Sequence, residues 1–311
     1  MVRSITAPVR PGRWRGHPGL LLPLFLAGCA PAPQASAPAV HPAIVSLNPC
    51  TDAILAEVAE PGQLRALSAY SRDPASSSMD VGLARRFPAT SGTVEEVAAL
   101  RPDVVVSGTF VSPATRAALA RLGIPLVEMP IAASVPESAA QIRQLARLTG
   151  HPERGEALVR RIEHALAAAA PPPGPPVTAV VWQAGGIVPG ANTLIADLLH
   201  RTGFASLSAA RGLRQADFLP LERMLADPPQ VILAAGDGLS GEDRLLTHPA
   251  LAALPQTRRE PLAPSLLWCG GATIIRAAAR LDEVRRGLGG MQSRSVAGPP
   301  PAPPAGGRGV T

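Results

Sequence analysis

The sequence predicts an α/β protein with two lobes, each built on a parallel sheet, and a ligand cleft between them. Three observations lead to this prediction. Short apolar runs alternate with helical segments, this alternation occurs twice, and two helices without an intervening strand separate the two occurrences. With 311 residues, of which 46% are hydrophobic and 17% charged, the chain can bury a core in each lobe.

The first alternation, residues 43–135, is the predicted N-terminal lobe. A run of three valines, Val104 to Val106, is typical of a parallel strand that is buried on both faces. Thr51 and Asp52 can cap the first helix. The pattern predicts strands at 43–47, 64–68, 103–107 and 125–129, and helices at 53–59, 94–100 and 113–122.

Residues 136–170 are the predicted helical connection. Helices are expected at 136–148 and 152–169, because Gly150, His151 and Pro152 interrupt an otherwise helical pattern. The second helix is the single long helix that joins the lobes. The proline-rich segment 171–176 that follows is expected to be a stiff loop.

Residues 177–289 form the predicted C-terminal lobe. The pattern predicts strands at 178–182 and 230–234, and helical segments at 192–202, 221–226, 248–254 and 273–288. Residues 290–311 are rich in Pro, Gly and Arg, and are expected to be a disordered tail. Two such Rossmann-like lobes place the ligand cleft between them, beyond the carboxyl ends of the strands.

The N-terminus has the features of an export signal, residues 1–28. Four arginines precede an apolar run at 20–27, which is shorter than the roughly 20 residues of a membrane-spanning helix. The run ends in Leu26-Ala27-Gly28-Cys29, which resembles the bacterial lipobox and implies cleavage before Cys29 and lipidation of its thiol. The alternative is an ordinary cleaved signal in which Cys29 is incidental. Residues 29–42 are expected to be a flexible stalk.

The net charge of +6 does not indicate nucleic-acid binding. Four of the 29 basic residues lie in the signal, and the rest of the chain carries 25 basic against 23 acidic residues. Those basic residues are scattered among acidic ones, whereas a nucleic-acid site needs a concentrated basic surface. We therefore expect no nucleic-acid partner.

Several segments resemble the substrate-binding proteins of ABC importers for iron–siderophores, haem and vitamin B12. The resemblance covers about residues 43–288. The most specific part is Gly92-Thr93-Val94-Glu95-Glu96-Val97 with Leu100-Arg101-Pro102-Asp103-Val104-Val105-Val106. A similar motif in the second lobe runs from Leu221-Glu222-Arg223-Met224-Leu225 to Asp227-Pro228-Pro229-Gln230-Val231-Ile232. Weaker matches are Ile44-Val45-Ser46-Leu47-Asn48-Pro49 and Leu67-Ser68-Ala69-Tyr70-Ser71.

The resemblance implies a lipid-anchored protein at the periplasmic face of a membrane. It would capture an iron chelate or a corrinoid and deliver it to an ABC permease. In this family one glutamate on each lobe faces an arginine of the permease, and Glu95 and Glu222 occupy the matching positions. The structural alternative is that each glutamate simply favours the first turn of its helix.

Aromatic residues are the candidate ligand contacts. Tyr70, Trp182 and Trp268 lie at strand ends or in loops where the cleft is expected, and aromatic faces suit a flat chelate. Core packing is the alternative for each. The family can place a large aromatic residue in the loop after Val106, where this chain has Gly108 with Phe110 nearby. Asn48, directly after the first strand, completes the predicted contacts.

Cys50 and Cys269 are expected near the cleft mouth, on opposite lobes. They could form a disulfide in an oxidising compartment, contact a metal in the ligand, or remain as two buried thiols.

Other classes of function are weaker. The histidines at 151, 164, 200 and 248 are dispersed, so we expect no metal site, and no nucleophile elbow or nucleotide-binding motif is present. We therefore expect no catalysis and no cofactor. We also expect the protein to be a monomer. Two alternatives remain: an envelope scaffold without ligand affinity, and a chelatase-like enzyme, which would need a catalytic His or carboxylate pair in the cleft.

Overall fold

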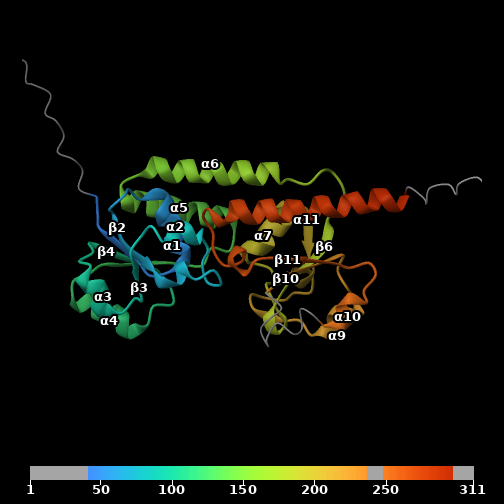
Figure 1. Ribbon diagram of the computed structural model, residues 1–311, viewed down its shortest axis with the longest axis horizontal. Coiled ribbons are helices and arrows are strands. Elements are labelled where there is room, and N and C mark those ends of the chain that lie inside the picture. Colours follow the sequence, from blue (N-terminus) through green and yellow to red (C-terminus); the bar gives the residue numbers. More distant parts are fainter. Residues whose placement is uncertain (1–40, 237–247, 297–311) are drawn as a thin grey trace, which may run out of the picture. The chain divides into compact units, whose positions relative to one another are not determined.

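The computed structural model describes residues 41–236 and 248–296, and it has the predicted α/β architecture (Figure 1). The chain divides into two units, residues 1–40 and 41–311, and all described residues belong to the second. The predicted signal and Cys29 therefore lie outside the described residues. In the described part, no helix is both long enough and apolar enough to cross a membrane.

The N-terminal lobe is built on a five-stranded parallel sheet in the order β3-β2-β1-β4-β5. Its central strands are fully buried because helices cover both faces, as the run of valines indicated. The strands are β1 Ile44–Ser46, β2 Leu64–Ser68, β3 Ala89–Thr90, β4 Val104–Gly108 and β5 Leu126–Met129. The helices are α1 Pro49–Val58, α2 Val81–Ala84, α3 Val94–Ala99 and α4 Pro113–Arg121, with a 3₁₀ turn, η1, at Ala69–Arg72.

Most helices of this lobe begin at a side chain that caps the first turn. Asn48 caps α1, Asp80 caps α2, Thr93 caps α3 and Ser112 caps α4, and each accepts a hydrogen bond from a backbone N–H in the first turn. The cap of α1 is therefore Asn48, and the predicted caps Thr51 and Asp52 lie inside the helix. Helix α1 starts earlier than predicted because Pro49 suits the first helical position.

The helical connection consists of α5 Val135–Thr149 and α6 Pro152–Ala168. Gly150 adopts the left-handed conformation that ends α5. Gly155 lets the two helices approach closely, since a Cβ there would lie 2.5 Å from the Cβ of Ala146. Helix α6 packs against α1 of the first lobe and against α11 of the second, so it spans both.

The C-terminal lobe is built on a four-stranded parallel sheet in the order β11-β10-β6-β8. A two-stranded antiparallel ribbon, β7-β9, is added beside it. The strands are β6 Val177–Gln183, β7 Ile187–Val188, β8 Phe204–Ser206, β9 Asp217–Phe218, β10 Val231–Ala235 and β11 Arg258–Pro261. The helices are α7 Leu194–Arg201, α8 Leu207–Ala210, α9 Leu221–Ala226, α10 Pro249–Ala252 and α11 Thr273–Val296, with 3₁₀ turns η2 Ala184–Gly186 and η4 Pro264–Leu266.

Two predicted segment boundaries, those of the stalk and of the tail, differ from the structure. The last helix, α11, continues to Val296, so the segment from 290 to 296 is helical. Interior glycines such as Gly289 and Gly290 cost a helix only about 1 kcal/mol each, which does not force it to end. At the other end, His41 and Pro42 belong to the folded unit and not to a stalk, because the Gln63 side chain donates a hydrogen bond to the Pro42 carbonyl.

One apolar core runs through both lobes and the helical connection. It includes Ile44 and Leu55 of the first lobe, Leu158 of α6, and Val181 and Ile274 of the second lobe. Each lobe adds a smaller cluster on the other face of its sheet. The two lobes therefore share packed side chains on the side where α6 lies.

Candidate functional site

The candidate site is a cavity of about 430 Å³ between the two lobes. The first lobe lines it with the segments that follow β1, β4 and β5. The second lobe lines it with the end of β6, the start of α7 and the loop before α11. The cavity thus lies beyond the carboxyl ends of parallel strands, where open α/β sheets bind ligands.

Exposed apolar side chains surround the cavity. Phe110 is 84% exposed and Trp268 is 56% exposed, and both line it together with the exposed Ile131 and Ile187. Exposed large apolar side chains are normally scattered singly over a protein surface. A group of them around a hollow therefore marks a binding surface. The site can therefore hold a ligand that extends beyond the enclosed volume.

No charged residue lines the cavity in the part of the chain that the structure describes. Its polar side chains are chiefly carboxamides, which both donate and accept hydrogen bonds. These five are Asn48, Gln141, Gln183, Asn192 and Gln215. An apolar, carboxamide-lined cavity suits a ligand that is itself uncharged at its contact surface and rich in hydrogen-bonding groups.

The backbone is strained at two lining positions. Asn192 and Ala216 adopt positive φ angles of 58° each, and both line the cavity. Such conformations are uncommon for residues other than glycine and concentrate at binding sites. The strain supports the assignment of this cavity as the functional site.

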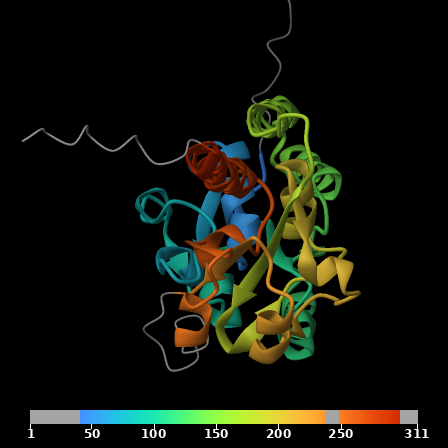
Figure 2. The ribbon, with the colours of Figure 1, turned by 90° about the vertical axis from the view of Figure 1, so that its right-hand side faces the viewer.

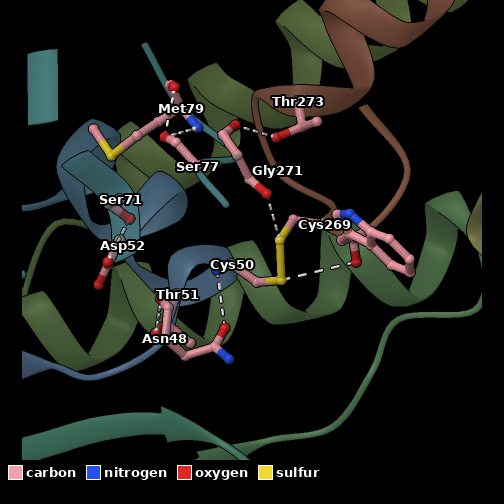
Figure 3. The surroundings of a disulfide bond; sticks show 12 residues. Asn48, Cys50, Thr51, Asp52, Ser71, Ser77, Met79, Cys269, Gly271 and Thr273 are labelled. Atoms are coloured by element: carbon pink, nitrogen blue, oxygen red, sulfur yellow. Dashed lines mark hydrogen bonds between the residues drawn. A yellow bond between two sulfur atoms is a disulfide. The ribbon is translucent and has the colours of Figure 1, made fainter. Parts of the chain in front are cut away.

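Asn48 is held in place by its role as a helix cap. Its Oδ1 accepts a hydrogen bond of 2.9 Å from the Cys50 backbone N–H (Figure 3). Gly108 makes room for it, since a Cβ there would approach the Asn48 Nδ2 to 3.0 Å. The absence of a side chain at Gly108, the last residue of β4, thus leaves space for the Asn48 amide at the cavity wall.

Tyr70 lies beside the main cavity rather than in it. It is 64% exposed in η1 and lines a second, smaller hollow of about 370 Å³ together with Asn48 and Phe110. Phe110 and Asn48 line both hollows. Tyr70 can therefore reach only a ligand that extends across Phe110.

Trp182 is not at the cavity, which corrects the prediction that it contacts the ligand. Its side chain is fully buried and packs with Val180 and Met224 on one face of the second sheet. Successive residues of a strand point to opposite faces, and β6 ends one residue later than predicted. Gln183, at the end of the strand, lines the cavity instead.

A disulfide joins Cys50 of the first lobe to Cys269 of the second, with a Cα–Cα distance of 4.9 Å (Figure 3). Of the three alternatives for these cysteines, the structure thus contains the pairing. Cys50 lines the cavity, and the Ser78 hydroxyl donates a hydrogen bond to the Cys269 sulfur. The covalent link between the lobes therefore forms part of the cavity wall.

The glycine pair beside Cys269 lets the lobes meet closely. A Cβ at Gly270 would lie 2.2 Å from the Ser138 hydroxyl, and one at Gly271 would lie 2.7 Å from the Ile54 side chain. The Gly271 N–H also donates to the Ser138 hydroxyl. The pair is a packing feature of the junction between α1, α5 and α11.

Asp52 lies two residues after Cys50 in α1 and is fully buried. Burial raises the pKa of this carboxyl to about 8, although hydrogen bonds that stabilise its charged form oppose the shift. The Ser71 hydroxyl and the Ser68 backbone N–H both donate to Oδ2, while Oδ1 has no partner among the described residues (Figure 3).

Glu95 and Glu222 are exposed residues in the first turns of α3 and α9. Neither carboxylate has a hydrogen-bond or ion-pair partner in the described part of the chain. Both helices lie on the side of the unit remote from α6 (Figures 1 and 2). In contrast, the neighbouring Glu96 accepts hydrogen bonds from the Thr90 hydroxyl and the Ser91 N–H, which lower its pKa.

Four of the five carboxamides were not predicted from the sequence, namely Gln141, Gln183, Asn192 and Gln215. A usable signal existed for two of them, because Gln183 directly follows a predicted strand and Asn192 opens a predicted helix. Gln141 and Gln215 come from a helix and a loop that sequence alone does not direct toward the cleft.

A family model described as a periplasmic binding protein matches residues 44–260. No curated protein sequence matches the chain. Among solved structures, the periplasmic haem-binding protein HutB of Vibrio cholerae is similar with a TM-score of 0.65 and 18% identity, covering 78% of this chain and 97% of that one.

Two further structures show the same fold. The periplasmic haem-binding protein RhuT from Roseiflexus sp. RS-1 in apo form has a TM-score of 0.63 and 24% identity, covering 78% of this chain and 95% of that one. The periplasmic vitamin B12 binding protein BtuF of Vibrio cholerae has a TM-score of 0.60 and 19% identity, covering 78% and 96%. At these identities the likeness establishes the fold.

Proposed function

This chain belongs to the periplasmic binding protein family, and we propose that it captures a corrinoid such as vitamin B12 and delivers it to an ABC importer. Proteins of this family bind substrates and are periplasmic, and solved structures with the same fold bind haem or vitamin B12. The ligand of this chain is inferred from its own cavity.

The uncharged cavity is the observation that carries the proposal. A corrinoid is a flat metal chelate whose ring edge carries neutral carboxamide groups, which pair with carboxamide side chains such as Gln183 and Gln141. Haem carries two carboxylates, and an iron–siderophore is commonly anionic. Either would favour cationic side chains, and the described lining offers none. The exposed rings of Phe110 and Trp268 suit the faces of a flat ring.

Export, membrane anchoring and docking on the permease are inferred from the N-terminal segment and from two surface glutamates. The signal-like segment and Gly28-Cys29 support export and lipid anchoring at Cys29. Glu95 and Glu222 have no partner within the described ranges, which supports docking on a permease, because exposed carboxylates are available to arginines of a partner. The described lining holds no histidine or carboxylate, which counts against the chelatase-like alternative.

Tryptophan fluorescence of the full-length chain tests the ligand. Cyanocobalamin, haem and a ferric siderophore are each titrated into the protein, and we expect cyanocobalamin to give the tightest saturable quenching. Trp268→Phe is expected to lose most of the quenching, because Trp268 lines the cavity and Trp182 does not. Gln183→Leu is expected to weaken binding about tenfold, since an unpaired amide of the bound ligand costs about 1–3 kcal/mol.

Tighter binding of haem or of the siderophore than of cyanocobalamin would reject the corrinoid assignment. Absence of binding by all three would favour the envelope scaffold. Trp268→Phe in turn separates the cavity from any other site, because unchanged quenching in this variant would place the ligand elsewhere.

A further inference from the structure

A second cluster of polar side chains lies away from the cavity, around His41, the first residue that the structure describes. His41, Glu60 and His151 each offer one metal-ligating atom, and these atoms all lie within 4.8 Å of one another. The three residues come from the segment before β1, the segment that follows α1 and the junction between α5 and α6. The dispersed histidines of the sequence gave no sign of this pairing.

His151 has a nitrogen that the fold does not use. The side chain is only 9% exposed, and its Nε2 has no hydrogen-bond partner among the described residues. The nearest carboxylate oxygen, Oε1 of Glu60, is 3.6 Å away, beyond a normal hydrogen bond. A buried, unpartnered ring nitrogen that faces a carboxylate is a group that a bound cation would satisfy.

His41 is held next to His151 by its surroundings. The two rings lie 4.4 Å apart between centroids, at an angle of 51°. The His41 ring lies against Gly150, where a Cβ would be 2.3 Å from Nδ1. Gln63 fixes the adjacent backbone, because its amide donates to the carbonyls of Pro42 and Thr149. The two imidazoles are therefore brought together by the fold.

Two carboxylates and one arginine surround the cluster. Glu60 and Glu153 both lie near His151, with Glu153 Oε1 at 3.5 Å from Nδ1. Arg154 is the neighbouring cation, with Nη2 at 3.8 Å from Glu60 Oε1, and it also donates to the Ala59 carbonyl. The Glu60 side chain is 45% exposed, which leaves it free to turn from Arg154 toward a metal ion.

We propose that His41, Glu60 and His151 bind a divalent transition-metal ion of the zinc class. Two imidazoles and one carboxylate form a ligand set that zinc uses, and a fourth position would remain for water. Glu153 lies near the other ring nitrogen of His151, Nδ1, where it can orient the imidazole. A bound ion would tie the chain just before β1 to the junction between α5 and α6. The site is independent of the cavity and of the proposed function.

Zinc titration of the full-length chain tests this site. Free Zn²⁺ is followed with a competing colorimetric chelator, and Co²⁺ serves as a second probe through its visible absorption. We expect one ion per chain, and a loss of affinity of about tenfold or more in His41→Ala and in Glu60→Gln, since even residues that only orient metal ligands contribute 10–100-fold.

His164→Ala is the matched control. His164 is an exposed histidine on α6, the helix that begins directly after His151. It is expected to bind zinc as the unchanged chain does. His151→Gln removes the buried ligand but can disturb folding, so His41→Ala and Glu60→Gln decide the outcome. Zinc binding that is absent, or that survives unchanged in both of these variants, would overturn the proposal.

Discussion

At the scale of single residues, Asp52 couples the protein's stability to pH. Its pKa is raised by burial to about 8 in the folded chain, against about 4 in the unfolded chain. Between these values the folded chain holds a proton that the unfolded chain has lost. The stability that this carboxyl contributes is therefore fully present below about pH 4 and is lost as pH rises toward 8.

We expect Asp52→Asn to remove this loss. The amide resembles the protonated carboxyl, and its oxygen can still accept hydrogen bonds from Ser71 and from the Ser68 N–H. The free energy of unfolding is measured with urea at pH 5 and at pH 8. A single carboxyl can change it by up to about 1.4 kcal/mol per pH unit. An equal pH dependence in Asp52→Asn and the unchanged chain would show that Asp52 is not the group responsible.

The residues of the cavity show what a sequence can predict about a site. Asn48 and Trp268 were predicted from their positions after a strand and in the loop before the last helix, and Phe110 from the loop after Val106 to which the family resemblance pointed. All three line the cavity, because those positions face the cleft in this architecture. The prediction for Trp182 was wrong because its side chain packs into the core on one face of the sheet, and the next residue, Gln183, ends β6 at the cavity. Sequence pattern fixes the strand but not its last residue.

At the scale of elements, α3 and α9 present equivalent first turns on the two lobes. Each places one exposed glutamate, unpartnered among the residues that the structure describes, on the side remote from α6, whereas Glu96 accepts hydrogen bonds from Thr90 and Ser91. We expect Glu95→Ala combined with Glu222→Ala to abolish uptake while ligand binding is retained. Uptake of labelled ligand by cells, beside fluorescence titration of the purified protein, separates the two effects.

Glu163→Ala is the control for this pair, because Glu163 is an exposed glutamate on α6, on the opposite side of the unit. It is expected to support normal uptake. Uptake that persists in the double variant would assign both glutamates to the helix dipole alone.

The elements that escaped prediction are the short ones. Strands β3 and β9 have two residues each, and β8 has three, which is too little for an alternation or an apolar run to stand out. β11 reads Arg-Arg-Glu-Pro and has no apolar pattern, yet it pairs along β10 at the edge of the sheet. Its Glu260 pairs with Arg258 and Arg280, so ionic contacts accompany the strand pairing there.

At the scale of the whole folded unit, the lobes are joined by more than the helix α6. The Cys50–Cys269 disulfide (Figure 3), the close approach of Gly271 to the Ile54 side chain, and the hydrogen bond from the Thr273 hydroxyl to the Ser78 carbonyl all cross between them. The shared core continues through the same region. These links limit how far the cavity can open, which favours small movements over a wide opening of the lobes.

The disulfide closes 219 residues of sequence, so it restricts the unfolded chain strongly. We expect its removal in Cys50→Ser, Cys269→Ser or the double variant to lower the free energy of unfolding by about 2–5 kcal/mol. The three variants should have the same free energy of unfolding as one another and as the reduced form of the unchanged chain, since all of them lack the disulfide. Urea unfolding with and without reductant provides the comparison.

The effect on the ligand distinguishes a purely structural link from one that shapes the cavity. Cys50 lines the cavity wall beside Asn48, so loss of the bond frees this wall to move relative to Trp268 on the other lobe. We therefore expect the double serine variant to bind ligand more weakly and to release it faster, as measured by stopped-flow fluorescence. Unchanged release with lowered stability would mean that the shared core alone holds the cavity in its binding form.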